Sequence, residues 1–229
     1  MSNDPPNDVL AFDVYGTLID PFHMEMHLRG VFCEKAKEAS ELWRGKQLEY
    51  SFRRALMKKY LNFDICTAQA LRFVCCHFGV SPSDEILRGL LKLYLELPVY
   101  SDVPEALTKL KERGFKLLAC SNGTEDAVRG LLNYAGVLPR FSGIVSVDKI
   151  GTFKPDPAVY EYLVAQSNGP KEKVWLISSN PFDAIGAKAC GLRTVWVRRD
   201  PKRVFDPWEF EPDLIVTSLE DLPIELGVL

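Results

Sequence analysis

The stretch "LAFDVYGTLIDP", residues 10 to 21, places an acid at the end of an apolar run and follows it with a glycine. The run from Val9 to Phe12 is continuously apolar, which is typical of a strand buried on both faces of a parallel sheet. Asp13 ends this strand, and Gly16 begins a turn. A carboxylate at the carboxyl end of such a strand lies at the edge where open parallel sheets bind ligands.

Five more short apolar runs follow, at 115–120, 143–147, 173–178, 193–198 and 213–217. Between them the sequence predicts helices at 103–113, 125–135, 157–166 and 183–190. Three of these helices are followed by a glycine at a plausible C′ position: Gly114, Gly136 and Gly191. Strands and helices that alternate at this length predict an α/β fold with a doubly wound parallel sheet.

Residues 20–98 interrupt this alternation. Helix formers fill 34–60, and further helical segments are predicted at 67–77 and 84–96. The sequence therefore predicts a helical cap subdomain at 20–98, inserted into a core made of residues 1–19 and 99–229.

The composition is that of an ordinary globular protein. Of the 229 residues, 47% are hydrophobic and 26% are charged, and the formal net charge is −3. No basic stripe is present, so we expect no nucleic-acid partner and no membrane-surface binding. The tightest basic cluster joins Arg198 and Arg199 to Lys202 and Arg203. A solvated surface loop explains it.

The sequence also gives an expectation for the compartment. Residues 1–8 are polar and lack the apolar core of a signal peptide, and no apolar stretch reaches the roughly 18 residues needed to span a bilayer. Six scattered cysteines without a C-x-x-C pair suit a reducing environment. We therefore expect a cytoplasmic protein.

Polar side chains follow four of the predicted strands or the loops after them. They are Asp13, Tyr15 and Thr17 after the first run, Ser121 and Asn122 after the second, Lys154 after the third, and Ser178, Ser179, Asn180 and Asp183 after the fourth. Each group taken alone is explained by turn formation, helix capping or a solvated lysine. Their occurrence at successive strand ends of one sheet predicts a shared site.

The segments "FDVYGT", "SNGT", "KPDP" and "SSNPFD" resemble the four motifs of the haloacid dehalogenase superfamily, and the likeness covers nearly the whole chain. This resemblance implies an α/β fold with a Rossmann-like, doubly wound parallel sheet core and an inserted helical-bundle cap.

Tyr15 separates two branches of that superfamily. Most members are Mg²⁺-dependent phosphatases in which a second Asp, two positions after the nucleophile, protonates the leaving oxygen. Tyr15 occupies that position here, and a phenol with an ordinary pKa of about 10 is a poor substitute. At these motifs only Asp13 and Asp183 remain as carboxylates, which is few for Mg²⁺.

"DVYGT" resembles instead the L-2-haloacid dehalogenases, which displace a halide from carbon without a metal or any other cofactor. Their cap contributes an arginine from a helix that begins Leu-Trp-Arg, and Leu42, Trp43 and Arg44 match it. Trp43 is also well explained as a residue of the bundle core.

The resemblance implies a role for each matching residue. Asp13 would attack the substrate, with Thr17 and Lys154 holding its carboxylate. Ser121, Asn122 and the backbone after Tyr15 would bind the substrate carboxylate. The halide would lie against Arg44 and Asn180 and an apolar wall of Leu48, Phe63 and Phe182. In the dehalogenases the residue that matches Phe182 is often Trp, so the size of the pocket stays open.

The same resemblance implies how the ester intermediate is hydrolysed. Asp183, helped by Ser178, Asn180 and Lys154, would position and deprotonate a water. Tyr160 also matches a position that the dehalogenases use, although helix packing explains it as well.

The leading hypothesis is therefore a cofactor-free hydrolase that converts small (S)-2-haloacids to (R)-2-hydroxyacids. Two alternatives remain open: a Mg²⁺-dependent phosphatase acting on a small phosphoester, and a binding module that has kept the fold without activity. The resemblance also implies a homodimer.

Overall fold

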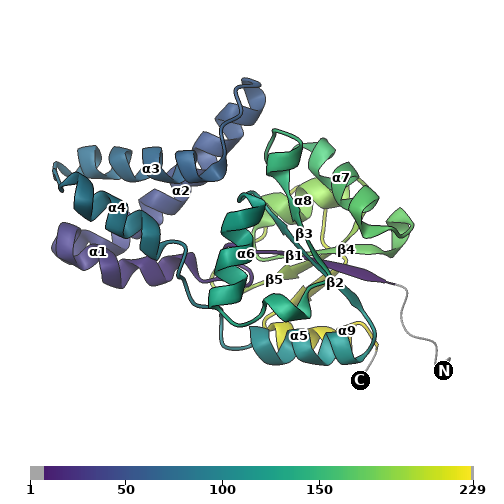
Figure 1. The fold of residues 1–229 in the computed structure, drawn as a ribbon. Helices are drawn as coiled ribbons and strands as arrows, with labels where there is room; N and C mark the ends of the chain where they lie inside the picture. The colour runs from purple at the N-terminus through teal and green to yellow at the C-terminus, as the bar shows by residue number, and fades with distance from the viewer. Residues whose placement is uncertain (1–7, 228–229) are drawn as a thin grey trace.

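The computed structural model describes residues 8–227. Its centre is a six-stranded sheet in the order β3-β2-β1-β4-β5-β6, in which all neighbouring strands are parallel (Figure 1). The strands are β1 (Val9–Asp13), β2 (Lys116–Ser121), β3 (Gly143–Ser146), β4 (Val174–Ser178), β5 (Arg193–Val197) and β6 (Leu214–Val216). The predicted doubly wound α/β fold is confirmed. Residues 1–7 and 228–229 of the predicted core, and most of the polar segment 1–8, lie outside the described residues.

Helices cover both faces of the sheet. They are α5 (Val103–Glu112), α6 (Glu125–Tyr134), α7 (Pro157–Ser167), α8 (Pro181–Ala189) and α9 (Leu222–Glu225). Leu10 and Phe12 of β1 belong to a cluster with apolar residues of α5, α6 and α9, whereas Val9 and Ala11 belong to one with α7 and α8. Successive side chains of the strand thus pack on opposite faces of the sheet, which is why β1 is apolar from Val9 to Phe12.

Four helices form a separate group beside the sheet (Figure 1). They are α1 (Met24–Phe32), α2 (Ala36–Leu56), α3 (Phe63–Phe78) and α4 (Asp84–Leu93). The sequence did not predict α1, and it extended the helix at 34–60 past its observed ends. Cys33 and Lys58 both have a positive φ, 50° and 53°, which interrupts the helix on either side of α2. Across the described residues, no helix combines the length and apolarity that crossing a membrane requires.

The two ends of the inserted segment meet beside β1. Ile19 and Val99 form an antiparallel bridge. The Asp20 N–H donates to the Pro98 carbonyl at 3.0 Å, and the Tyr100 N–H donates to the Leu18 carbonyl at 3.0 Å. The chain therefore leaves and re-enters the sheet layer at one point, directly after the turn that follows Asp13.

Gly186 offers a test of how closely α8 packs against α7. A Cβ at this position would lie 2.6 Å from Pro155 Cβ and 2.6 Å from the Tyr160 hydroxyl. We expect Gly186→Ala to lower the free energy of unfolding by about 1–3 kcal/mol, because neither neighbour can move freely. Urea denaturation measures this.

The matched control is Gly130→Ala in α6, where an added Cβ meets nothing within 4 Å. That change should raise stability by up to about 1 kcal/mol, since alanine favours the helix. Equal urea midpoints for the two variants would contradict the close packing at Gly186.

Candidate active site

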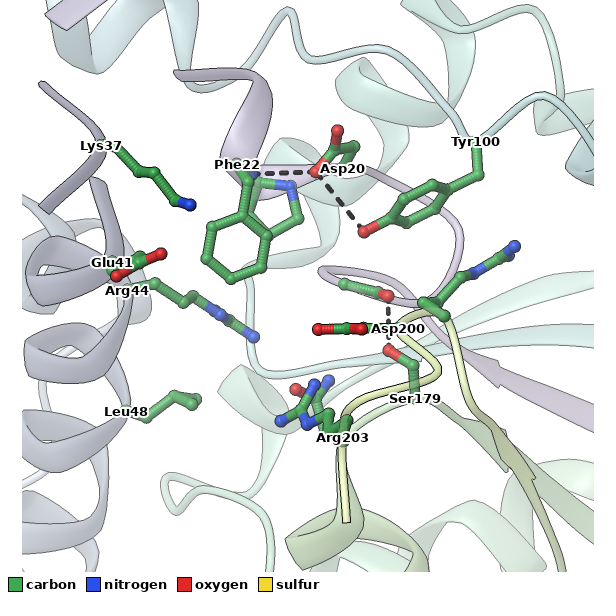
Figure 2. A pocket seen from close by; sticks show the side chains of 14 residues that line it. Asp20, Phe22, Lys37, Glu41, Arg44, Leu48, Tyr100, Ser179, Asp200 and Arg203 are labelled. Carbon is green, nitrogen blue, oxygen red and sulfur yellow. Dashed lines mark hydrogen bonds between the residues drawn. The ribbon is translucent and has the colours of Figure 1, made fainter. Parts of the chain in front are cut away.

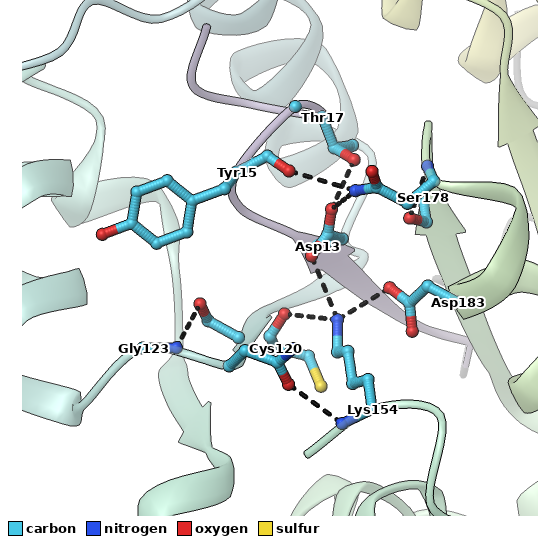
Figure 3. A network of polar contacts seen from close by, with 12 residues as sticks. Asp13, Tyr15, Thr17, Cys120, Gly123, Lys154, Ser178 and Asp183 are labelled. Atoms are coloured by element: carbon cyan, nitrogen blue, oxygen red, sulfur yellow. Dashed lines mark hydrogen bonds and ion pairs between the residues drawn. The ribbon is translucent and has the colours of Figure 1, made fainter. Parts of the chain in front are cut away.

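The site lies where β1 and β4 end side by side. Between these strands the order of the sheet reverses, because β2 and β3 lie on one side and β5 and β6 on the other. Asp13 ends β1, Ser178 ends β4, and Asn180 and Asp183 follow at the start of α8 (Figure 3). This is the edge at which the sequence predicted a shared site.

The Asp13 carboxylate is buried and accepts three hydrogen bonds. Its Oδ2 accepts from Thr17 Oγ1 at 2.8 Å and from Asn180 Nδ2 at 2.8 Å. Its Oδ1 accepts from Lys154 Nζ at 3.1 Å. Three donors from separate segments hold this carboxylate in one orientation, and one of them carries a full positive charge.

Lys154 connects the two buried carboxylates. Its side chain is 1% exposed, and Nζ lies 3.1 Å from Asp13 Oδ1 and 2.7 Å from Asp183 Oδ2. The third ammonium hydrogen goes to the Cys120 carbonyl at 2.9 Å, so all three donors are used. Burial alone would lower the pKa of Lys154, but the charges of Asp13 and Asp183 raise it above its ordinary value. The lysine is therefore a permanent cation.

Asp183 is fully buried and bound on both oxygens. Its Oδ2 accepts from Lys154, and its Oδ1 accepts from the Tyr160 hydroxyl at 2.9 Å. Burial raises the pKa of Asp183, the Lys154 charge opposes this, and the charge of Asp13 adds to it. The net pKa lies above that of an ordinary carboxyl group, which suits a base that must take up a proton.

Tyr15 directs its ring away from the carboxylates and into the helical group. The ring stacks on Tyr94 with centroids 5.5 Å apart and lies 5.9 Å from Phe63. Burial, with smaller contributions from Tyr94 and Asp64, raises the pKa of the Tyr15 phenol well above its usual value. Tyr15 is thus a packing residue that cannot deliver a proton at neutral pH.

The Tyr15 carbonyl joins Arg44 to the carboxylate site. It accepts from Arg44 Nη2 at 3.2 Å and from Asn180 Nδ2 at 3.0 Å. The other guanidinium nitrogen, Arg44 Nη1, is buried and has no hydrogen-bond partner among the residues the structure describes. A buried donor of this kind is costly unless a ligand satisfies it.

Arg44 opens on a cavity of about 630 Å³ between α2 and the sheet (Figure 2). Leu48, one helical turn further along α2, lines the same cavity, as the sequence predicted from their shared helix face. Gly16, Ser179 and Asn180 form its inner wall. At Gly16 the φ of +92° disfavours any other residue, and this turn carries the Tyr15 carbonyl towards Arg44.

Ser121 and Asn122 lie at the end of β2 and are buried. Ser121 Oγ accepts from the Gly123 N–H at 3.0 Å, and Asn122 Oδ1 accepts from the Lys154 N–H at 3.0 Å. The Ser121 hydroxyl can still donate its own hydrogen, and Asn122 fixes the loop that carries Lys154. Ser178 similarly accepts from the Asn180 N–H at 3.1 Å.

Two predicted wall residues, Phe63 and Phe182, do not line the cavity at Arg44. Phe63 is buried between Tyr15 and Phe153. Phe182 packs on Phe52 with centroids 5.1 Å apart and lines a second, mainly apolar cavity of about 620 Å³. Trp43 is 1% exposed and donates to the Thr67 carbonyl at 2.9 Å, so it is a residue of the helical core.

The basic cluster at 198–203 differs from its interpretation as a purely solvated loop. Arg199 and Arg203 both line the Arg44 cavity. Arg199 forms an ion pair with Asp102 at 2.5 Å and donates to the Thr17 carbonyl at 2.7 Å. No periodic pattern predicts these contacts, because they depend on the path of a long loop.

Ser179 was likewise assigned no role from the sequence. Its N–H donates to Thr17 Oγ1 at 2.8 Å, and its hydroxyl donates to the Gly16 carbonyl. These bonds tie the turn after β1 to the end of β4. The run of three polar residues at 178–180 was the sequence feature that could have indicated this role for Ser179.

Cys120 places a thiol beside the site, and its carbonyl accepts from Lys154 (Figure 3). Burial raises the pKa of the neighbouring Cys120 thiol to about 12, so this thiol stays protonated. Within residues 8–227, no group of three or more His, Cys, Asp or Glu side chains is arranged to hold a metal ion. The cation between Asp13 and Asp183 is the Lys154 ammonium.

Known proteins resemble this chain over most of its length. The model of the haloacid dehalogenase-like hydrolases matches residues 8–191. The chain is 40% identical to an (S)-2-haloacid dehalogenase of Pseudomonas sp. (strain YL) over 211 residues, which cover 92% of this chain and 90% of that protein. It is 35% identical to an (S)-2-haloacid dehalogenase of Pseudomonas putida over 213 residues, 93% of each.

The fold agrees with a solved structure as well. The L-2-haloacid dehalogenase from Xanthobacter autotrophicus with chloropropionic acid covalently bound superposes with a TM-score of 0.89 at 28% identity, covering 96% of this chain and 98% of the other. The family match spans most of the chain and includes the segments that carry Asp13, Lys154 and Asp183. The chain therefore belongs to the haloacid dehalogenase-like hydrolases.

Proposed function

We propose that this protein is a hydrolytic dehalogenase that converts small (S)-2-haloacids to (R)-2-hydroxyacids and halide through an aspartyl-ester intermediate. The observation that carries the proposal is an oriented Asp13 carboxylate in the same site as Arg44 Nη1, which has no hydrogen-bond partner among the described residues. Tyr15 occupies the position from which an acid would protonate a leaving alkoxide. The names of the relatives support the same activity.

In the first step an oxygen of Asp13 attacks C2 of the substrate on the side opposite the halogen. The new C–O bond forms as the carbon–halogen bond breaks, and the bonding pair leaves with the halide. Attack from the rear inverts C2. The halide is a weak base and needs no proton, so the step requires neither an acid nor a cofactor. Arg44 Nη1 offers the donor for the departing anion.

In the second step Asp183 takes a proton from water as the water oxygen attacks the ester carbonyl carbon of Asp13. Collapse of the tetrahedral intermediate breaks the bond between that carbon and the ester oxygen. The departing alkoxide takes back the proton held by Asp183, the hydroxyl proton of the intermediate is released to water, and the Asp13 carboxylate is restored. Lys154 lies within 3.1 Å of both carboxylates and stabilises the negative charge that moves between them.

The substrate carboxylate is assigned to the space between the turn after Tyr15 and the end of β2. There the Ser121 hydroxyl and the Asn122 amide, with backbone N–H groups, would supply donors. The helical segment 20–98 acts as the cap in this scheme, because its Arg44 and Leu48 close the side of the site that faces the halogen.

We further propose a cytoplasmic enzyme that works as a homodimer. All six cysteines are free, which suits a reducing compartment. Leu56 and Met57 at the end of α2 are 85% and 59% exposed, and they give the cap an apolar surface for a second copy.

The phosphatase alternative has no support in the site. A phosphoester requires a proton for its leaving oxygen, and Tyr15 is buried with a pKa that is raised rather than lowered. An inactive binding module would not need to keep Asp13, Lys154, Asp183 and Arg44 in one network.

Halide release from the two enantiomers of 2-chloropropionate tests the proposal. With excess EDTA present, we expect chloride from the (S)-form only, at the same rate as without EDTA, because an oriented carboxylate approaches C2 from one side. The Asp13→Asn variant is the control and should release none. Chloride from neither enantiomer, together with Mg²⁺-dependent hydrolysis of a phosphoester, would instead establish the phosphatase.

Arg44→Lys tests the proposed halide ligand. The lysine keeps the charge but cannot reach the Tyr15 carbonyl and the halide with a planar fork, so kcat/KM for (S)-2-chloropropionate should fall about tenfold or more. Arg53→Lys, on the exposed side of α2, is the matched control. Wild-type kinetics in the Arg44 variant would remove this arginine from the mechanism.

Tyr160→Phe tests Asp183 as the base. The Tyr160 hydroxyl lowers the pKa of Asp183, so its loss should raise that pKa further. A base works only when deprotonated, so activity is lost as the pH falls through the pKa of Asp183. In Tyr160→Phe the acid limb of the kcat profile should therefore move to higher pH by about half to one unit. Tyr162→Phe in the same helix is the control. An acid limb that is the same in both variants would argue against Asp183.

A further inference from the structure

The cavity at Arg44 extends well beyond the space that a two- or three-carbon acid needs. Its inner wall, at Gly16 and Asn180, adjoins the Asp13 carboxylate, and its volume is about 630 Å³. The outer wall includes Arg203, which stands on the loop between β5 and β6 and reaches the cavity from the side opposite α2 (Figure 2). Three arginines, Arg44 of α2 and Arg199 and Arg203 of the loop, thus line one space.

Arg203 is the less engaged of the two loop arginines. Arg199 is bound to Asp102 and to the Thr17 carbonyl and lies over the Tyr100 ring at 4.2 Å. Arg203, in contrast, has no side-chain hydrogen bond and no ion pair within 4.0 Å in the described part of the chain, 8–227. Its guanidinium is therefore free to bind a ligand.

None of the acids that line the cavity forms an ion pair with Arg203 within 4.0 Å across residues 8–227. They are Asp20, Glu41 and Asp200. Asp20 accepts from the Phe22 N–H at 2.9 Å, and Asp200 accepts from the Lys202 N–H at 2.8 Å. Loss of solvation on the cavity side, followed by the charge of Arg44, lowers the pKa of Arg203, and the charges of Asp206 and Asp200 oppose this. An anion between the two guanidinium groups would offset their repulsion.

The reaction proposed above sends an anion into this space. Asp13 attacks from the rear, so the halide departs along the same axis, away from Asp13 and towards Arg44. Arg203 lines the same cavity as Arg44. We propose that Arg203 forms a second halide subsite there, which receives the product halide from Arg44 and governs its release. The halide as occupant rests on the proposed function.

Chloride binding by the resting protein tests this subsite without turnover. The excess NMR line width of chloride, titrated against the wild-type protein, reports exchange with bound anion. We expect Arg203→Gln to weaken chloride binding about tenfold, because a charged hydrogen-bond donor is lost. Arg203→Lys should restore part of the affinity. Lys202→Gln, the same charge change on the adjacent exposed residue, should leave it unchanged.

Bromide inhibition of (S)-2-chloropropionate turnover gives a second readout, and it should weaken in Arg203→Gln by a similar factor. Chloride binding in Arg203→Gln equal to that in Lys202→Gln, with turnover intact, would overturn the subsite and leave the dehalogenase standing. Loss of chloride binding in Arg203→Gln, in a protein that dehalogenates neither enantiomer, would uphold an anion site at Arg203 and remove the dehalogenase.

Discussion

The site depends on one buried ammonium group. Lys154 Nζ has three hydrogen-bond partners, Asp13 at the end of β1, Asp183 in α8 and the Cys120 carbonyl in β2. Two buried carboxylates this close would repel each other strongly, and a buried lysine without them would lose its proton. Each charge is therefore tolerable only because the others are present. Because the partners come from three elements, the charge balance also fixes how those elements meet.

Tyr15 adds a second constraint, which joins the sheet to the inserted helices. Its ring packs on Tyr94 at the end of α4 and on Phe63 at the start of α3. Its carbonyl accepts from Arg44 of α2 and from Asn180. One residue thus sets the distance between the carboxylate and the guanidinium. Tyr15 therefore places an aromatic ring rather than an acid at the second position after Asp13, and the same ring docks the helices.

The sequence predicted the features that depend on neighbouring residues, namely the strands and the polar residues at their ends. The six strands were predicted because most of them are continuously apolar. Asp13, Lys154 and Asp183 were grouped because the carboxyl ends of parallel strands share an edge. The helix α1 was missed since its end depends on the positive φ of Cys33, a residue with no turn preference. The contacts of Phe182 with Phe52 and the place of Arg203 at the cavity were not predicted, for a related reason. The direction of a side chain at a helix start or on a long loop is set by packing against distant segments.

Arg44 and Arg203 differ in their exposure to water, and this difference affects how an anion would leave the site. Arg44 is partly buried and held by the Tyr15 carbonyl, so its free Nη1 has a fixed position and little competing water. Such a site favours the developing halide but would also retain the product. Arg203 is exposed at the rim, where water screens its charge. An anion that passes from the first guanidinium to the second moves from strong to weak attraction, and release requires that order. The proposed chemistry needs a tight site next to Asp13, and turnover needs a looser one beyond it.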